Sequence, residues 1–307
     1  MTRPIAILIA LALLIAAPFA IYPVFLMKIL CFALFACAFN LILGYGGLLS
    51  FGHAAFFGGA AYVTGHALTV WGLPTELGIL AGTVAAGAFG AVVGQLAIRR
   101  QGIYFAMITL ALAQMAYFFF VSADFTGGEN GLQGVPRGYA LGLFDLTDNL
   151  AMYYFVLIVF LTGFAVIART VHSPFGQVLR AIRDNEDRAV SLGYDVERAK
   201  LLAFTLSATI AGLAGATKTV VFQLASLTDV NWHMSGEVVL MTLLGGVGTL
   251  IGPAFGAGVI ISLQNLLASG PLSAWVPVVM GAIFVLCVLA FRRGIVGEFA
   301  AMMRRSF

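Results

Sequence analysis

The chain has 307 residues, of which 61% are hydrophobic and only 9% are charged, and its net charge is +3. An average soluble protein has about a quarter of its residues charged. Together with a mean hydropathy of +1.03, this composition excludes a soluble globular enzyme, a disordered protein and a nucleic-acid-binding protein. The three cysteines, Cys31, Cys37 and Cys287, lie in apolar runs, so we expect no disulfide framework.

Apolar stretches long enough to cross a bilayer lie between the charged residues. Asp, Glu, Lys and Arg are absent from residues 4–27, 29–75, 77–98, 101–123, 149–168, 201–217 and 238–291. A charge in the middle of a membrane is costly, so these runs indicate membrane helices. Glycine-rich or Gly-Pro breaks at 44–47, 245–248 and 270–271 divide the two longest runs, and the piece at about 237–247 is short enough to be a half-helix or re-entrant segment.

We therefore expect an all-α, polytopic membrane helix bundle in a single transmembrane domain over residues 1–307. Its predicted number of transmembrane helices is about ten, with eight plus re-entrant segments as the alternative. The first apolar segment also has features of a signal peptide, but no clean A-x-A cleavage site follows it. We expect this segment to be retained as a membrane helix.

Basic residues predict the orientation of the bundle. Thirteen of the sixteen Lys and Arg residues are Arg3, Arg99, Arg100, Arg169, Arg180, Arg183, Arg188, Arg198, Lys200, Arg292, Arg293, Arg304 and Arg305. The positive-inside rule places these residues, and both termini, in the cytoplasm. The segments left outside are acidic, with Glu76, Asp124, Glu129, Asp145 and Asp148, and Arg137 is the basic exception there.

The predicted cytoplasmic loop at 169–200 has the pattern of an amphipathic helix. Ser173-Pro174 is typical of a helix start, and Gly193 of a helix end. One apolar face is formed by residues at spacings of three and four, namely Phe175, Val178, Leu179 and Ile182. The other faces carry both signs of charge, which favours a protein partner over lipid headgroups as the surface that this helix contacts.

The predicted external loop at 122–150 is rich in glycine between residues 125 and 137, which indicates a folded, turn-rich segment. Polar residues inside the predicted spans are candidates for lining a path, although Ser and Thr there often bond to their own helix. Lys218 and Glu237 border apolar runs, where an ionisable group is either functional or interfacial. The four histidines lack metal-ligand spacing, and residues 212–219 lack the glycine directly before the lysine of a phosphate-binding loop, so we expect neither a metal site nor a nucleotide site.

A weak internal echo relates two parts of the chain at an offset of 199 residues. The first copy holds Gly46-Gly47, Ser50, Ala55-Phe56 and Gly59, and the second holds Gly245-Gly246, Thr249, Ala254-Phe255 and Gly258. Duplicated halves are common in transporters.

Three ordered motifs carry a resemblance that covers about residues 25 to 290. They are the segment 44–58, continuing to Ala61-Tyr62, the segment 126–136, and the segment 173–186, continuing through Leu192-Gly193 to residues 200–204. With these motifs the chain resembles the LivM-type inner-membrane permeases of branched-chain amino-acid ABC transporters. Urea, amide and other amino-acid systems use similar subunits, so the substrate stays open.

The resemblance implies a multi-pass subunit of the bacterial inner membrane that works by alternating access. The implied partners are two cytoplasmic ATPase subunits, which would hold ATP and Mg, a second permease subunit in a heterodimer, a periplasmic substrate-binding protein and an amino-acid substrate. No catalytic residue, cofactor or nucleic-acid partner is expected for this chain. The helix at 174–193 would be the coupling helix that docks into an ATPase subunit.

Three sets of site residues follow from these interpretations. The predicted coupling residues are Phe175, Val178, Leu179, Arg180, Ile182, Arg183, Asp184, Asn185, Glu186, Arg188, Leu192 and Gly193. The candidate pathway residues are Asn40, Ser50, His53, Thr109, Gln114, Glu237 and Thr242. The candidate contacts with a binding protein are Thr126, Glu129, Asn130 and Arg137. The alternatives are an ion-coupled secondary transporter, which would need acidic residues deep in the spans, and a structural or assembly protein.

Overall fold

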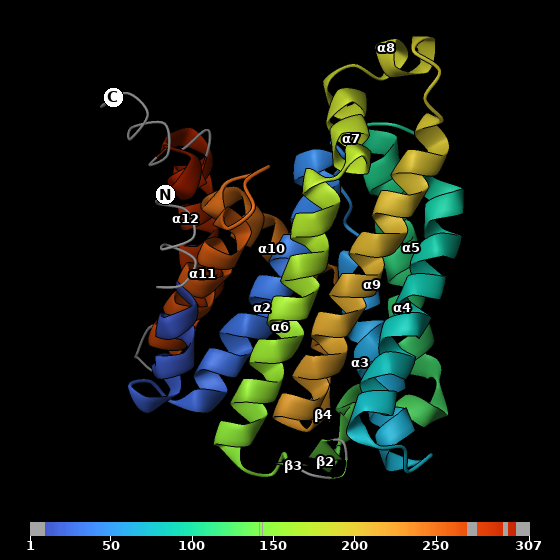
Figure 1. Cartoon of the computed structure of the whole chain (residues 1–307). Helices are drawn as coiled ribbons and strands as arrows, with labels where there is room; N and C mark the ends of the chain where they lie inside the picture. The colour runs from blue at the N-terminus through green and yellow to red at the C-terminus, as the bar shows by residue number, and fades with distance from the viewer. Residues whose placement is uncertain (1–9, 141, 143, 269–274, 291–293, 299–307) are drawn as a thin grey trace.

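The computed structural model describes residues 10–140, 142, 144–268, 275–290 and 294–298. The α-helices with assigned bounds in this part of the chain are α2 (Pro23–Asn40), α3 (His53–Thr69), α4 (Thr75–Ala97), α5 (Ile103–Ser122), α6 (Asn149–His172), α7 (Pro174–Asp184), α8 (Glu186–Ser191), α9 (Val196–Phe222), α10 (Trp232–Gly245), α11 (Gly252–Ala268) and α12 (Val276–Ala290). They run side by side between one end that carries α7 and α8 and an opposite end that carries short strands (Figure 1).

The predicted all-α helix bundle is confirmed. Within the described residues, five helices are long and apolar enough to cross a membrane: Pro23–Tyr45, Thr75–Ala97, Ile103–Ser122, Asn149–His172 and Val196–Phe222. Two shorter apolar helices are Ala10–Phe19 and Gly252–Ala268. The number of crossings and the location of the termini stay predictions. The expected break at 270–271 and the basic residues Arg3, Arg292, Arg293, Arg304 and Arg305 lie outside the described residues.

Helix α9 lies in the core of the bundle and packs against α2, α3 and α4. Small residues allow these helices to approach closely. A Cβ atom on Gly215 would lie 1.9 Å from the carbonyl oxygen of Phe57, and one on Gly212 would lie 2.2 Å from the Cβ of Ala86. The glycine content of the chain is therefore partly a packing requirement of its central helix.

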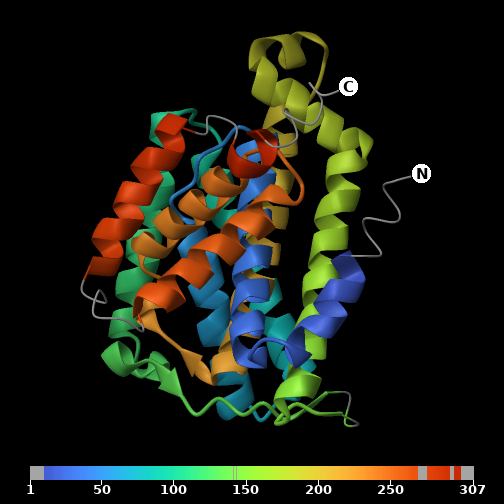
Figure 2. The ribbon, with the colours of Figure 1, turned by 90° about the vertical axis from the view of Figure 1, so that its left-hand side faces the viewer.

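Two helical hairpins are interrupted by glycine-rich segments. Helix α2 continues into the π-helical turn η2 (Leu41–Tyr45), and an irregular stretch at 46–52 then leads into α3. Helix α10 ends at Gly245, and a stretch at 246–251 leads into α11, which lies next to it (Figure 2). With 14 residues, α10 is about 21 Å long, shorter than the ~30 Å of a bilayer core. The piece near 237–247 thus belongs to a short helix, and its interpretation as a half-helix or re-entrant segment stays a prediction.

Short strands fold the segment at 122–150 onto the end of the bundle. Strand β1 (Leu132–Gln133) pairs antiparallel with β4 (Leu224–Ala225), and β2 (Tyr139–Ala140) pairs antiparallel with β3 (Phe144–Asp145). Three 3-10 turns complete this end: η3 (Asp124–Thr126), η4 (Gly128–Asn130) and η5 (Leu227–Asp229). The segment at 122–150 is thus joined to the connection between α9 and α10.

Candidate functional site

Helices α7 and α8 project beyond the bundle at one end (Figure 1). The side-chain oxygen of Ser173 accepts from the backbone N–H of Gly176, as its N-cap position predicts. The expected single helix over 174–193 is wrong in one respect, because the helix breaks at Asn185. The backbone of Asn185 is extended, with a φ of −161°, and its side-chain oxygen caps α8 by accepting from Arg188 N at 2.9 Å.

The apolar face of α7 points into the protein itself. Leu179 is 1% exposed and Ile182 is 3% exposed, while Phe175 and Val178 are half-buried against the same hydrophobic core. This face fastens α7 to the bundle. It is therefore not the surface that a docking partner would contact.

Three charged residues predicted to contact a partner are held by the chain itself. Arg180 donates to the carbonyl of Val171 at 3.2 Å, and its guanidinium lies 5.3 Å from the ring centre of Tyr45. Glu186 forms an ion pair with Lys200 at 2.6 Å, and the Lys200 side chain is only 4% exposed. Arg183 donates to a backbone carbonyl of the bundle. These residues anchor the projection.

The tip of the projection carries three exposed apolar side chains. Val190 is 57% exposed, Leu192 is 67% exposed and Tyr194 is 45% exposed. We call these three residues the apolar tip. The sequence interpretation included Leu192 but missed Val190 and Tyr194, because it treated residues 174–193 as one helix with one apolar face. Asp184, Asn185, Arg188 and Gly193 are exposed around the same tip.

We call the stretch at 46–52 the first interruption and the stretch at 246–251 the second. Two candidate pathway residues lie beside the second interruption, Asn40 on α2 and Thr242 on α10. The side chain of Asn40 donates to the carbonyl of Thr249 at 2.8 Å and accepts from the N–H of Gly248 at 2.9 Å. Thr242 is fully buried and donates to the carbonyl of Val238 in its own helix. Both side chains therefore have structural partners.

Three more candidates meet at the first interruption. The hydroxyl of Thr109 accepts from Phe51 N at 3.2 Å, and Ser50 Oγ accepts from Gly52 N at 3.2 Å. The side chain of His53 is fully buried among aromatic rings, and its Nε2 lies 2.9 Å from the hydroxyl of Ser207. Because that hydroxyl donates to the carbonyl of Ala38 at 2.6 Å, His53 Nε2 carries the hydrogen.

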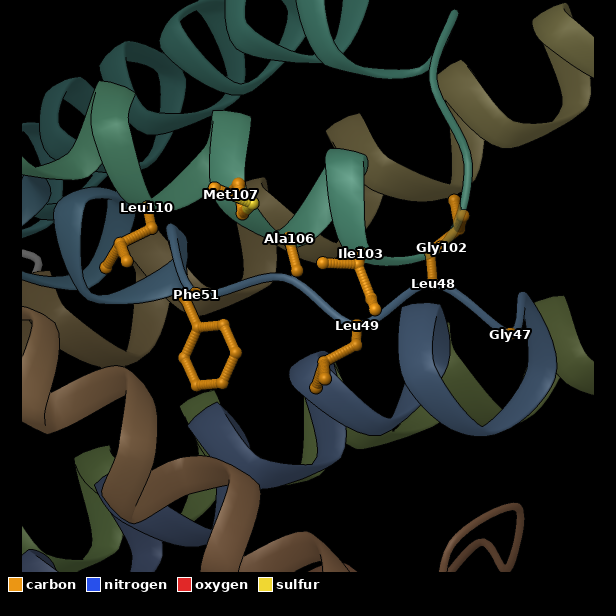
Figure 3. Close-up of a pocket in the computed structure, with 9 residues that line it drawn as sticks. All are labelled: Gly47, Leu48, Leu49, Phe51, Gly102, Ile103, Ala106, Met107 and Leu110. Carbon is orange, nitrogen blue, oxygen red and sulfur yellow. The ribbon is translucent and has the colours of Figure 1, made fainter.

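A cavity of about 440 Å³ borders this first interruption (Figure 3). One side is the chain at Gly47, Leu48, Leu49 and Phe51, and the other is the first part of α5 with Gly102, Ile103, Ala106, Met107 and Leu110. The side chains in this lining are apolar. Irregular backbone at membrane depth is tolerated where protein buries it or where it lines a cavity, and the stretch at 46–52 meets this description.

Charged residues gather near the connection between α9 and α10. Lys218 forms an ion pair with Asp229, with Nζ 2.6 Å from Oδ1, and the Asp229 side chain is 2% exposed. Glu237 is half-buried, accepts a hydrogen bond from Gln264 and lies within electrostatic range of Lys28. Lys218 is therefore a structural partner of Asp229. The candidate pathway residue Gln114 lies apart from this group in the sequence and is half-buried on α5.

The four residues of the segment at 122–150 that we predicted to contact a binding protein are either exposed or held within the chain. Glu129 and Asn130 are exposed, whereas Thr126 is buried and donates to the carbonyl of Phe120. Arg137 is a clamp.

Arg137 joins α6 and α9 at this end of the bundle. Its guanidinium donates to the side chain of Asn149 at 2.9 Å, in the first turn of α6, and to the carbonyl of Val221 at 2.8 Å, in the last turn of α9. Only Glu129 and Asn130 of the four predicted residues are thus available to a partner without a rearrangement.

Comparison with known proteins identifies relatives over part of the chain. The LivM permease of the high-affinity branched-chain amino acid transport system of Salmonella typhimurium is 28% identical over 61% of this chain and 49% of its own length. The autoinducer 2 import permease LsrC of an Enterobacter species is 30% identical over 62% of this chain and 54% of its own length. The ribose import permease RbsC of Bacillus subtilis is 30% identical over 54% of this chain and 51% of its own length.

The chain spans about half the length of the curated relatives it matches. No solved structure matches it. Residues 22–288 match the family described as "Branched-chain amino acid transport system / permease component", a range that runs from α2 into α12. The chain belongs to this family of transport permeases.

Proposed function

We propose that the chain is a membrane-spanning permease subunit of an ATP-driven importer for branched-chain, hydrophobic amino acids. Separate ATPase subunits on the cytoplasmic face, at the end of α7 and α8, drive alternating access. A second permease subunit and a periplasmic binding protein complete the importer. The observation that carries this proposal is the apolar tip, which exposes Val190, Leu192 and Tyr194 beyond the bundle in a chain of this permease family.

An exposed apolar cluster on a polar projection is a protein-docking feature. Aromatic and large aliphatic side chains supply most of the binding free energy at interfaces. The charges around the tip include Asp187 and Arg188, which are exposed and of opposite sign. A mixed-charge rim of this kind gives specificity to an apolar contact.

Docking is tested by co-purification. The chain is expressed together with ATPase, second-permease and binding-protein subunits encoded by its own organism, and ATPase subunits are quantified after affinity purification of the chain. Leu192→Asp combined with Tyr194→Asp is expected to lower the recovered ATPase at least tenfold, because two charges enter an apolar contact. Gln177→Asp is the matched control, since Gln177 is exposed on α7 away from the apolar tip. Equal recovery of ATPase with both variants contradicts the docking proposal.

The branched-chain substrate is proposed from the relatives, which also include permeases named for autoinducer 2 and ribose. Apolar side chains line the cavity beside the first interruption, as expected for a hydrophobic cargo. Thermal shift of the purified binding protein with leucine, isoleucine and valine, against ribose and urea, tests the class. A shift with ribose or urea alone contradicts it.

An ion-coupled transporter that works alone is the alternative function. Asp229 is a buried acidic residue of the kind such a mechanism needs, but Lys218 already neutralises it. Uptake of labelled leucine by the purified chain in liposomes, with a proton gradient and no ATPase, would favour this alternative.

A further inference from the structure

The two interrupted hairpins meet through their backbones. A Cβ atom on Gly44 would lie 2.5 Å from the backbone nitrogen of Gly248, so the two backbones approach each other closely. The amide of Asn40 spans the contact with two hydrogen bonds, one from Gly248 N and one to Thr249 O. We call Asn40, Gly44, Gly248 and Thr249 the junction.

Arg183 of α7 reaches the junction. Its Nη1 donates to the carbonyl of Gly44 at 2.6 Å, and the position of a Cβ on Gly248 would lie 3.7 Å from the same nitrogen. The methylene groups of Arg183 lie on Gly47, where a Cβ would come within 2.7 Å of Arg183 Cγ. A larger residue at position 47 would displace the arginine.

The neighbouring Asp184 orients this guanidinium. Asp184 Oδ1 accepts from Nε at 3.1 Å and from Nη2 at 2.9 Å, which leaves Nη1 directed at the junction. A cation that bonds a free carbonyl near a helix C-terminus is favoured by both the hydrogen bond and the helix dipole. Here that terminus is the π-helical turn η2, and such turns occur frequently at functional sites.

The junction and the stretches beside it contain the backbone freedom that a hinge needs. Gly47 has a φ of +70°, Gly246 of +122° and Gly248 of +74°, all in the region that favours glycine. Hinges are short segments that absorb such dihedral changes while the flanking helices stay rigid. The segments at 46–52 and 246–251 join helices of both hairpins, so a small change at the junction would redirect α3 and α11.

We propose that Arg183 is a positioning residue that transmits the movement of α7 to the junction, so that both interrupted hairpins respond to one ATPase subunit. This inference rests on the proposed function. In it, Arg183 acts through the carbonyl of Gly44 and not by contact with the ATPase. Val247 is 40% exposed beside the junction, so the labelling of a cysteine at this position reports a movement of the junction.

The test measures maleimide labelling of Val247→Cys in the assembled importer after Cys31, Cys37 and Cys287 have been replaced by alanine. Labelling is compared before and after trapping with ATP and vanadate. The otherwise unchanged importer is expected to alter its labelling rate at least threefold on trapping. Arg183→Ala is expected to reduce this response to below 1.5-fold, while the recovery of ATPase subunits and the basal ATP hydrolysis stay within twofold.

Arg198→Ala is the matched control, because Arg198 is an exposed arginine at the start of α9 whose side chain pairs with Asp195 and not with the junction. Arg183→Lys keeps the charge but loses the fork that holds Asp184 and Gly44 together, so an intermediate response is expected. If Arg183→Ala does not accumulate as folded protein, the labelling response of Arg183→Lys is compared with that of Arg198→Lys, and an equal response in the two variants overturns the inference.

Three results would overturn the inference. A full response in Arg183→Ala shows that the arginine does not transmit the movement. Loss of the ATPase in Arg183→Ala shows that the residue docks the partner. No response at Val247→Cys in a trapped, fully assembled importer shows that the junction does not move. By contrast, failure of the unmodified chain to recover any ATPase subunit counts against the proposed function itself.

Discussion

The two interruptions have similar sequences and equivalent backbone features, but they sit in different surroundings. Gly47 and Gly246 occupy equivalent positions at the offset of 199 residues, and both have positive φ. In the second hairpin the arms close on each other, with a Cβ on Gly245 lying 1.9 Å from the carbonyl oxygen of Gly252. In the first, α9 packs against both α2 and α3.

The equivalent phenylalanines show the same contrast. Phe56 is 1% exposed and packs edge-on against Phe89 and Phe204, whereas Phe255 is 49% exposed on α11. The glycine pattern therefore specifies the interruption, and the neighbouring helices decide whether a hairpin lies in the core or at the edge of the bundle.

The largest expected difference in the free energy of unfolding is between alanine variants of the two phenylalanines, Phe56 and Phe255. Phe56→Ala should lower the free energy of unfolding by about 3–5 kcal/mol, because it leaves a cavity in the core. Phe255→Ala should change it by less than about 0.5 kcal/mol, as expected for an exposed side chain. SDS titration of the purified chain in mixed micelles measures both. Similar losses for the two variants would mean that the second hairpin is as enclosed as the first.

The second-largest difference in stability is expected between alanine variants of the equivalent glycines at the start of the two interruptions, Gly46 and Gly245. Gly245→Ala is expected to cost about 1–3 kcal/mol or more, because its Cβ meets backbone that cannot rotate away. Gly46→Ala should be milder, since its closest contact is 2.8 Å and its φ is −92°. The yield of monodisperse protein after detergent extraction ranks the two. The reverse ranking would contradict the closed geometry of the second hairpin.

A smaller contrast is expected for two threonines. Thr109→Val removes the acceptor for Phe51 N, leaving a partly buried donor unpaired at a cost of about 1–2 kcal/mol. Thr249→Val loses a bond to the carbonyl of Gly246, but that carbonyl keeps the backbone bond from residue 249, so about 0.5 kcal/mol is expected. The melting temperature in detergent should fall further for Thr109→Val, and an equal fall would count against the fastening of the first interruption to α5.

The smallest changes in stability are expected in α3 and α11, the helices that follow the two interruptions. Gly59 and Gly258 are equivalent, and an added Cβ would meet nothing closer than 3.5 Å at either position. Gly59→Ala and Gly258→Ala should each raise the free energy of unfolding by about 0.5–1 kcal/mol through helix propensity. A marked destabilisation by either one, in the same SDS titration, would show a close contact on that hairpin.

The sequence was sufficient for those features that depend on hydropathy and local caps. Charge-free runs predicted the long helices, and Ser173 is the helix N-cap that its position indicates. The break at Asn185 was not predictable from periodicity, because the apolar face of α7 and the residues of α8 read as one pattern. It depends on a side-chain cap that becomes apparent only when both helices are placed.

The partners of the charged residues were also beyond the sequence. Arg180, Arg183 and Glu186 have the spacing of an exposed polar face, yet each contacts a group that is distant or non-adjacent in the chain: Val171, Gly44 and Lys200. One sequence does not show which side of a short helix faces its own bundle. The polar residues of the spans present the same difficulty, since Asn40 and Thr109 bond to backbone that only tertiary structure brings near.

Helix α9 gives the molecule a mechanical property of its own. It has 27 residues, about 40 Å of continuous helix, and it is tied at one end by the Glu186–Lys200 ion pair and at the other by the bond from Arg137 to Val221. A rod held in this way turns as one piece. A rotation of α9 that begins beside α8 would therefore reach the strands β1 and β4 at the opposite end. A protein bound to those strands would respond to this rotation even when no substrate is transported.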